Sequence, residues 1–418
     1  MVREMSYKLN IYDYNSQDIH VQMIARSFLL ARLRSHVKIA QVEYLTIWII
    51  YIKFILIAQA PIATRNLPMT IATTYATLPV LDLARLEAPL EERAAFLDEL
   101  RRTAHDLGFF YLTGHGVDPA LIRDVLSLSR RFFALPEADK QAIAMVNSPH
   151  FRGYNHTGQE YTRGERDWRE QVDIGAEREP LPLGADSPPW ARLQGPNQWP
   201  AALPELRETI LRYQTAVTEL ATRIVRSFAA ALGQPEDVFA PIYTPAPNQL
   251  LKLIRYPGRD ATESDQGVGA HKDGGFVTVL LQDVVPGLEV ERDDTWISAP
   301  PIPGTFVINI GEVLELASNG YLRANVHRVV TPPAGTDRLS VAFFFGARLD
   351  ATVPVLDLPA EFAAGVRGVT ADPRNPLFRE VGKNHLKSRL RSHPDVAQRH
   401  HADLLTSEVF AAVVAPPA

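Results

Sequence analysis

The residues best suited to chemistry in this 418-residue chain are His271 and Asp273, in the segment GAHKDGG, and His327, in ANVHRVV. In a strand, side chains at positions i and i+2 project from the same face, so an extended segment would point His271 and Asp273 together. Two imidazoles and one carboxylate on one side of a metal leave adjacent coordination positions open, as in oxygen-activating iron(II) centres. A zinc hydrolase more often keeps one open position and needs a nearby general base. We therefore predict that these three residues are the metal ligands and carry catalysis.

The triplet at His271 is not informative by itself. The chain has 12 His and 48 acidic residues, enough for a His-x-acid triplet to arise by chance. Two more such triplets, His393/Asp395 and His401/Asp403, lie in the polar, helix-like segment RSHPDVAQRHHADLL, and we interpret them as surface residues. What distinguishes the first triplet is a second histidine in a strand-like segment downstream.

A candidate anion-binding group follows the second histidine. Arg338 precedes LSVAFFF, the most apolar strand-like segment, and Ser340 lies two residues further on the same strand face. The planar guanidinium can bind a carboxylate through two hydrogen bonds, and the Ser340 hydroxyl can add a third. Tyr256, at the end of LLKLIRY, is another candidate donor.

Composition limits the chemistry available to this chain. There is no cysteine, which excludes disulfides, thiolate-bound zinc, iron–sulfur clusters and a cysteine nucleophile. The formal net charge is -5, so nothing indicates a nucleic-acid partner, for which a basic surface is typical. Any metal must therefore be held by His, Asp or Glu.

Three amphipathic helices are predicted upstream of these residues, over 91–107, 119–134 and 204–232. The third has apolar residues spaced alternately by three and four positions, and Gly233 is placed to end it. After Pro247 the pattern changes to short β-rich segments at 249–256, 276–283, 287–291, 305–310, 325–331 and 339–345, separated by Gly, Pro and Asp. Many short strands with turn residues between them indicate a sandwich or barrel, and a jelly roll is the compact solution.

The first 68 residues differ in composition from the rest, with 11 Ile against 12 in the following 350. The apolar segment 44–60 raises the question of a membrane span, but Lys53 near its centre is costly there. A signal peptide fits poorly because the segment begins late and lacks a convincing cleavage site. We expect that Met69 is the natural start and that 1–68 is not part of the native fold.

Taken together, the motifs resemble the isopenicillin N synthase-like family of iron(II)/2-oxoglutarate oxygenases, over about residues 79–400. The segments that carry the resemblance are PVLDL (79–83), HDLGFFYLTGHGV (105–117), FFALPEADK (132–140), RGY (152–154), GPNQWP (195–200), RYP (255–257), GAHKDGG (269–275), NVHRVVTP (325–332) and DRLSVAFFF (337–345). GPNQWP resembles the bacterial branch. Plant relatives often carry Asn at the position of Ile254, so the setting of Tyr256 differs here.

The resemblance implies an α+β fold, with a double-stranded β-helix (jelly roll) core and flanking helices, one of them long and lying along the barrel. It implies Fe(2+) bound by His271, Asp273 and His327, with 2-oxoglutarate as cosubstrate and O2 as oxidant. Arg338 and Ser340, assisted by Tyr256, would bind the distal carboxylate of 2-oxoglutarate. Oxidative decarboxylation would give succinate and carbon dioxide while a small-molecule substrate is oxidised.

On this interpretation the chain divides into four parts. These are the extension 1–68, a mainly helical dioxygenase region 69–240, the jelly-roll core 245–350 and a C-terminal tail 351–418 packing on or near the barrel. We expect a cytoplasmic enzyme with no membrane contact for the catalytic part, and the oligomeric state is not predicted. Candidate substrate contacts are Arg152, Tyr154, Glu160 and Glu170, each as well explained as a structural ion pair or rim residue.

Three alternatives stay open. An ethylene- and succinate-forming enzyme would act on 2-oxoglutarate and arginine with the same iron site. An isopenicillin N synthase-like oxidase would not use 2-oxoglutarate at all. A non-catalytic jelly-roll binding protein would have lost turnover, although the intact set of His271, Asp273, His327 and Arg338 argues against it.

Overall fold

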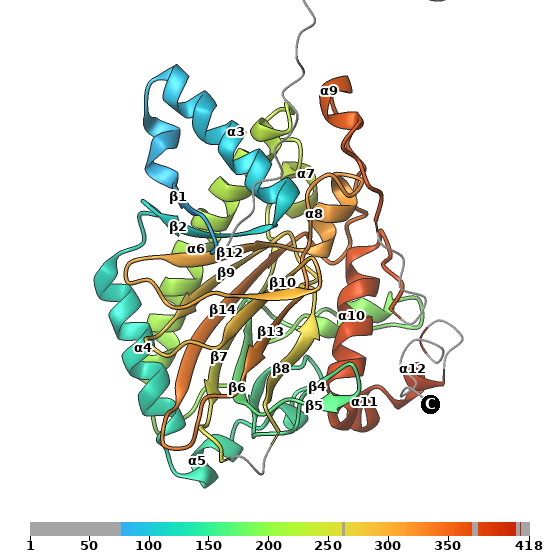
Figure 1. Cartoon of the computed structure of the whole chain (residues 1–418). Helices are drawn as coiled ribbons and strands as arrows, with labels where there is room; N and C mark the ends of the chain where they lie inside the picture. Colours follow the sequence, from blue (N-terminus) through green and yellow to red (C-terminus); the bar gives the residue numbers. More distant parts are fainter. Residues whose placement is uncertain (1–76, 261–263, 370–374, 407–409, 411–418) are drawn as a thin grey trace, which may run out of the picture. The chain divides into compact units, whose positions relative to one another are not determined.

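Two β-sheets facing each other form the centre of the molecule (Figure 1). The computed structural model describes residues 77–260, 264–369, 375–406 and 410, all within one compact unit, Ala72–Ala418. The extension 1–68 and its apolar segment lie outside the described residues. Among the described residues, no helix is long and apolar enough to cross a membrane.

The larger sheet has eight strands and the smaller sheet has four. In spatial order, the larger sheet comprises β1 (Val80–Asp82), β2 (Phe109–Thr113), β12 (Phe306–Ile310), β9 (Val277–Gln282), β14 (Arg338–Gly346), β7 (Asn248–Tyr256), β6 (Glu170–Gly175) and β3 (Gly153–Asn155). The smaller sheet comprises β11 (Thr295–Ser298), β10 (Leu288–Arg292), β13 (His327–Val330) and β8 (Gln266–His271). A separate pair is formed by β4 (Tyr161–Thr162) and β5 (Glu165–Arg166). Four strands of the larger sheet thus come from the region before residue 240.

The helices surround these sheets. They are α3 (Leu90–Asp106), α4 (Pro119–Phe133), α5 (Glu137–Gln141), α6 (Glu205–Ala231), α7 (Ala240–Tyr243), α8 (Glu312–Ala317), α9 (Ala360–Ala363), α10 (Val381–Ser392), α11 (Pro394–His400) and α12 (Ala402–Leu405), with short 3-10 turns at Leu83–Glu87, Met145–Asn147 and Pro189–Leu193. The three predicted helices correspond to α3, α4 and α6. The Asp118 side chain caps α4 by accepting a hydrogen bond from the Ala120 N–H, and Gly233, at φ +70°, follows the end of α6.

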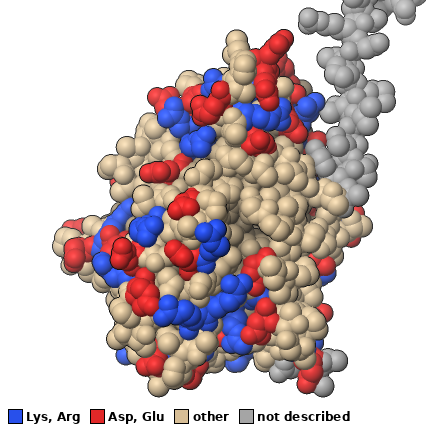
Figure 2. Space-filling model, turned by 90° about the vertical axis from the view of Figure 1, so that its left-hand side faces the viewer, with Lys and Arg blue, Asp and Glu red and all other residues tan. Residues whose placement is uncertain are grey.

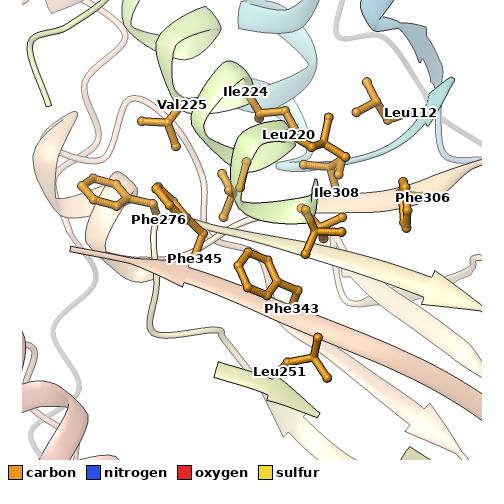
Figure 3. Close-up of a cluster of buried hydrophobic side chains, with 14 of the residues drawn as sticks. Leu112, Leu220, Ile224, Val225, Leu251, Phe276, Phe306, Ile308, Phe343 and Phe345 are labelled. Atoms are coloured by element: carbon orange, nitrogen blue, oxygen red, sulfur yellow. The ribbon is translucent and has the colours of Figure 1, made fainter. Parts of the chain in front are cut away.

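Alternation along the strands gives the larger sheet two different faces. The outer face packs against α6 and α4, where Phe343 and Phe345 of β14 meet Leu220 and Ile224 of α6 (Figure 3). The inner face points towards the smaller sheet, and Ile254, Tyr256 and Ala342 pack there with Val268, Leu288, Val290 and Val329. The register of β7 with β14 pairs Tyr256 with Arg338 and Ile254 with Ser340, so all four side chains project from the inner face.

Two sequence interpretations need correction. His393 and His401 were expected on the surface, but they are 0% and 1% exposed, because the C-terminal helices fold back onto the molecule. His393 sits between α10 and α11, and His401 stacks on Phe151 at a centroid distance of 5.0 Å.

The outer surface carries charges of both signs. On the face in Figure 2, positive and negative side chains are interspersed.

Candidate metal centre and cosubstrate site

The structure brings His271, Asp273 and His327 together between the two sheets. Their potential ligand atoms all lie within 4.8 Å of one another. The Asp273 Oδ1 atom is 3.4 Å from His271 Nε2 and 3.6 Å from His327 Nε2. Donor atoms bound about 2.1 Å from a metal, at angles between octahedral and tetrahedral, are themselves about 3.0–3.4 Å apart. The observed distances of 3.4 and 3.6 Å lie at or slightly above this range, close enough for the three groups to bind a single metal ion.

The two histidines are placed opposite each other by strand pairing. His327 begins β13 and His271 ends β8, and the two are directly paired in the antiparallel register. Each ring uses its Nδ1 atom on a backbone carbonyl, Gly269 O at 2.8 Å for His271 and Asn325 O at 3.3 Å for His327. A ring with Nδ1–H donating to a carbonyl presents the Nε2 lone pair, which is the form that binds a metal.

Asp273 is not positioned by the alternation of side chains along a strand, contrary to what we expected from the sequence. Strand β8 ends at His271, so Asp273 lies in the following turn. Its position comes instead from the larger sheet, because the Thr278 hydroxyl donates to Asp273 Oδ2 at 2.5 Å and the Asn309 amide donates to the same atom at 2.8 Å. With Oδ2 used twice, Oδ1 is the oxygen that faces both histidines. The arrangement favours binding of a metal through one carboxylate oxygen.

The electrostatics agree with a cation site. Burial raises the pKa of Asp273, but the nearby His327 and His271 rings and the Thr278 hydroxyl outweigh burial, so its pKa falls below the usual range. Burial and the neighbouring His271 lower the pKa of His327 to about 4. An ionised carboxylate beside a neutral imidazole is a suitable ligand pair for a divalent ion. Lys272 points elsewhere, with its Nζ 3.0 Å from Glu315 Oε2.

Arg338 lies on the inner face with the other predicted cosubstrate residues. Its side chain is 0% exposed, yet no carboxylate pairs with it among the described residues. One guanidinium nitrogen donates to Gln282 Oε1 at 2.8 Å, another is 3.5 Å from Ser340 Oγ, and Nε has no partner. The Tyr256 ring lies beneath the guanidinium, with the Arg338 Cζ atom 4.9 Å from its centroid. A buried guanidinium without a counterion fits a bound carboxylate, because an unpaired buried charge is costly.

The four candidate substrate residues separate onto two faces. Tyr154 and Glu170 lie on the outer, helix-facing side of β3 and β6, where the Tyr154 hydroxyl donates to Glu170 at 2.6 Å and Lys140 pairs with Glu170 at 2.9 Å. Glu160 and Arg152 are instead buried near the inner side of β6. Only Glu160 and Arg152 therefore remain as candidate substrate contacts.

Several inner-face residues were not found from the sequence. Thr278, Asn309 and Gln282 lie within apolar strand segments, where a single polar residue is a weak signal. Their inward direction follows from registers that pair Asn309 with Thr278 and Gln282 with Ser340. Side chains alternate between the two faces of a strand. Gln282 could have been assigned to the inner face only if its pairing with Ser340, between β9 and β14, had been known.

Comparisons with known proteins agree with this geometry. Residues 78–202 match the family model described as non-haem dioxygenase in morphine synthesis, N-terminal, and residues 247–347 match that of the 2OG-Fe(II) oxygenase superfamily. The 2-oxoglutarate-dependent dioxygenase frbJ of Dothideomycetidae sp. (strain 11243) is 36% identical, over 78% of this chain and 92% of the relative. Homoarginine-6-hydroxylase 2-ODD-C23.1 of Arabidopsis thaliana is 35% identical, over 71% of this chain and 92% of the relative.

Solved structures show the same fold. A putative 2OG-Fe(II) oxygenase family protein from Caulobacter crescentus has a TM-score of 0.59 at 29% identity, covering 75% of this chain and 98% of that one. The dioxygenase for auxin oxidation in rice has a TM-score of 0.54 at 27% identity, covering 75% of this chain and 95% of that one. The predicted jelly-roll core with flanking helices is confirmed.

Proposed function

Since the chain belongs to the 2OG-Fe(II) oxygenase superfamily, it is a non-haem iron(II)- and 2-oxoglutarate-dependent dioxygenase, and we propose that His271, Asp273 and His327 hold its iron. Iron(II), 2-oxoglutarate and O2 are its cofactor and cosubstrates, as predicted. The observation that supports the ligand set most directly is the cluster of three ligand atoms around one point, with Asp273 Oδ2 already occupied. When bound, the iron supplies oxygen activation, coupling decarboxylation of 2-oxoglutarate to oxidation of a small-molecule substrate.

Arg338 has the role of anchoring 2-oxoglutarate. Its guanidinium would bind the distal carboxylate, and the Ser340 hydroxyl would donate to the same carboxylate, while Gln282 fixes the guanidinium plane through one nitrogen. Tyr256 supports the guanidinium from below through its ring face. These contacts would orient the cosubstrate, and the apolar residues of the inner face around Arg338 would limit the access of water to it.

Variants at two positions test these assignments separately. Asp273→Ala removes the carboxylate ligand and should abolish iron binding, measured by anaerobic titration with Fe(II). Arg338→Ala should keep iron but weaken 2-oxoglutarate binding by roughly thirtyfold or more, because the cosubstrate carboxylate loses its charged partner. Arg338→Lys is the matched control, since it keeps the charge without the planar fork and should fall between wild type and Ala. Unchanged 2-oxoglutarate affinity in Arg338→Ala would refute the anchoring role.

Product analysis separates the related chemistries. Succinate formed in proportion to oxygen consumed supports the oxygenase with a separate substrate. Oxygen consumption without succinate would indicate an oxidase that does not use 2-oxoglutarate, and ethylene in the headspace would indicate the ethylene-forming reaction. The names of the relatives include homoarginine-6-hydroxylases, which makes homoarginine and arginine the first compounds to test as substrates.

Some finer assignments accompany the proposal. The order of the motifs supports placing the chain in the isopenicillin N synthase-like group, and GPNQWP supports a bacterial branch, although frbJ and the Arabidopsis homoarginine-6-hydroxylase come from a fungus and a plant. A cytoplasmic location is proposed because 2-oxoglutarate is a central metabolite. The division at 68, 240 and 350 also remains a proposal.

A further inference from the structure

A group of buried charged residues lies on the inner side of β6 and β7, beneath α10. It links Lys252 to Glu160 at 2.8 Å, Arg169 to Glu160 at 2.8 Å and Arg389 of α10 to Asp173 at 2.7 Å. None of its members is more than 8% exposed. We call it the inner charge cluster, and its members are Glu160, Asp167, Arg169, Asp173, Lys252 and Arg389.

The inner charge cluster borders the metal site. Arg169 pairs with Asp167 at 3.0 Å, and Asp167 Oδ1 accepts a hydrogen bond from the Gly269 N–H at 3.1 Å. Gly269 is also the residue whose carbonyl contacts the His271 ring at 2.8 Å. On the floor of the site, Lys252 and Tyr256 project from the same face of β7, because four positions separate them. Helix α10 contacts β4, and β4 in turn contacts β8, the strand that carries His271 (Figure 1).

Three buried polar atoms of this region have no hydrogen-bond partner. Two of them, Arg169 Nε and Arg389 Nη2, are donors, and the third, Gln171 Oε1, is an acceptor. Gln171 belongs to the same network, since its amide nitrogen donates to Asp173 at 2.8 Å. A buried donor or acceptor without a hydrogen bond costs free energy of folding. Three such atoms in one network therefore indicate a missing ligand.

The charges are also unbalanced. Within the inner charge cluster, three cations face three carboxylates. Arg152 adds a fourth buried cation nearby: it donates only to the carbonyls of Phe151 and Leu193, and no ion pair involving it occurs in the described part of the chain. Burial and the neighbouring Arg389 lower the pKa of Arg152 to about 10, which leaves it charged at neutral pH. Buried charge in excess of its counterions favours binding of an anion.

We propose that the inner charge cluster binds the carboxylate of an amino-acid-like substrate, with Arg169 and Arg389 donating to the carboxylate and Gln171 accepting from a substrate N–H. This inference rests on the proposed function, since it places the substrate beside the proposed iron site. It differs from the anchoring of 2-oxoglutarate, which uses Arg338, Gln282 and Ser340 on β14 and β9. The substrate class is therefore a compact acid that also carries an ammonium or amide group.

The test is equilibrium binding to the full-length enzyme loaded with iron and 2-oxoglutarate in the absence of oxygen. The probes are the twenty standard L-α-amino acids, arginine included, with homoarginine, each paired with its primary amide. We expect at least one acid to bind by calorimetry and its amide to bind at least about thirtyfold more weakly, because a buried cation loses its charged partner. If no acid binds, or if acid and amide bind equally, the inference is overturned and ordered water satisfies the three atoms.

Two variants locate the binding. Arg389→Lys keeps a positive charge opposite Asp173 but removes the spare N–H, and Gln171→Met removes the spare acceptor with a side chain of similar shape. Each should weaken binding of the acid at least about tenfold while 2-oxoglutarate affinity stays unchanged. Arg399→Lys, on neighbouring α11, is the matched control and should bind like wild type. Unchanged affinity for the acid in both Arg389→Lys and Gln171→Met would overturn the inference. If the wild-type enzyme did not bind 2-oxoglutarate, the proposed function would be refuted instead.

Discussion

Replacing Thr278 by Val tests whether the larger sheet orients the Asp273 carboxylate that we propose as a metal ligand. Val has nearly the same shape as Thr but lacks the hydroxyl that donates to Asp273 Oδ2 at 2.5 Å. Asn309 would then be the single remaining donor to that oxygen, and the carboxylate could rotate away from the two histidines. Removal of such an outer partner typically weakens metal binding 10–100-fold, or about 1.4–2.7 kcal/mol.

The assay is urea unfolding with and without Fe(II) under anaerobic conditions. At a metal concentration about 100 times the wild-type dissociation constant, bound metal stabilises the folded enzyme by about 2.7 kcal/mol. For Thr278→Val we expect this increment to fall to about 1.4–0.4 kcal/mol at the same metal concentration. Thr278→Ser, which keeps the hydroxyl, is the control and should retain most of the increment. If Thr278→Val kept the full metal-dependent stabilisation, the hydrogen bond would not be orienting Asp273, and our account of the site would be wrong.

Three further predictions concern the surroundings of the site. Gly311→Ala should abolish metal binding by calorimetry, because its new Cβ would lie 2.0 Å from the carbonyl oxygen of Gly275 in the turn that carries Asp273, whereas Gly274→Ala, with open space around it, should bind normally. Glu160→Gln should lower the free energy of unfolding at pH 7. Burial raises the pKa of Glu160, but Arg169, Lys252 and His393 lower it well below 4.5, so the loss should shrink as the pH falls below 4.5; a loss independent of pH would contradict this. Phe343→Ala should lower the free energy of unfolding by about 3–5 kcal/mol in chemical denaturation, because it empties a fully buried position against α6, and a loss below about 1 kcal/mol would contradict this packing.

The sequence was informative where one property repeats along a segment. Alternating apolar spacing located α6, and short β-rich segments located β7, β9, β10, β12, β13 and β14. Strand β8 was missed because QGVGAH contains two glycines and little β-branched sequence, although it carries His271. The strands β2 and β6 were not predicted; each pairs with one strand near in the sequence, β1 and β3, and with one far away, β12 and β7.

The candidate site shows the same limit. Residue types, together with the strand-like segments in which His327 and Arg338 lie, selected His271, Asp273, His327 and Arg338. The residues that orient them could not be selected, because Thr278, Asn309 and Gln282 acquire their roles only through pairing across strands. The burial of His393 could not be predicted either, since the polar sequence around it gave no sign that α10 packs against β6.

The position of α10 has a consequence for how this enzyme could diversify. The proposed iron ligands and the 2-oxoglutarate anchor lie on strands β8, β13 and β14 and the turn after β8, whereas Arg389 comes from a helix some fifty residues beyond Arg338. Exchanging that helix for another would alter which substrates bind, while the proposed iron ligands and the 2-oxoglutarate anchor stay in place. Truncating the chain before Val381 would remove α10 and with it Arg389, which we propose as a substrate contact.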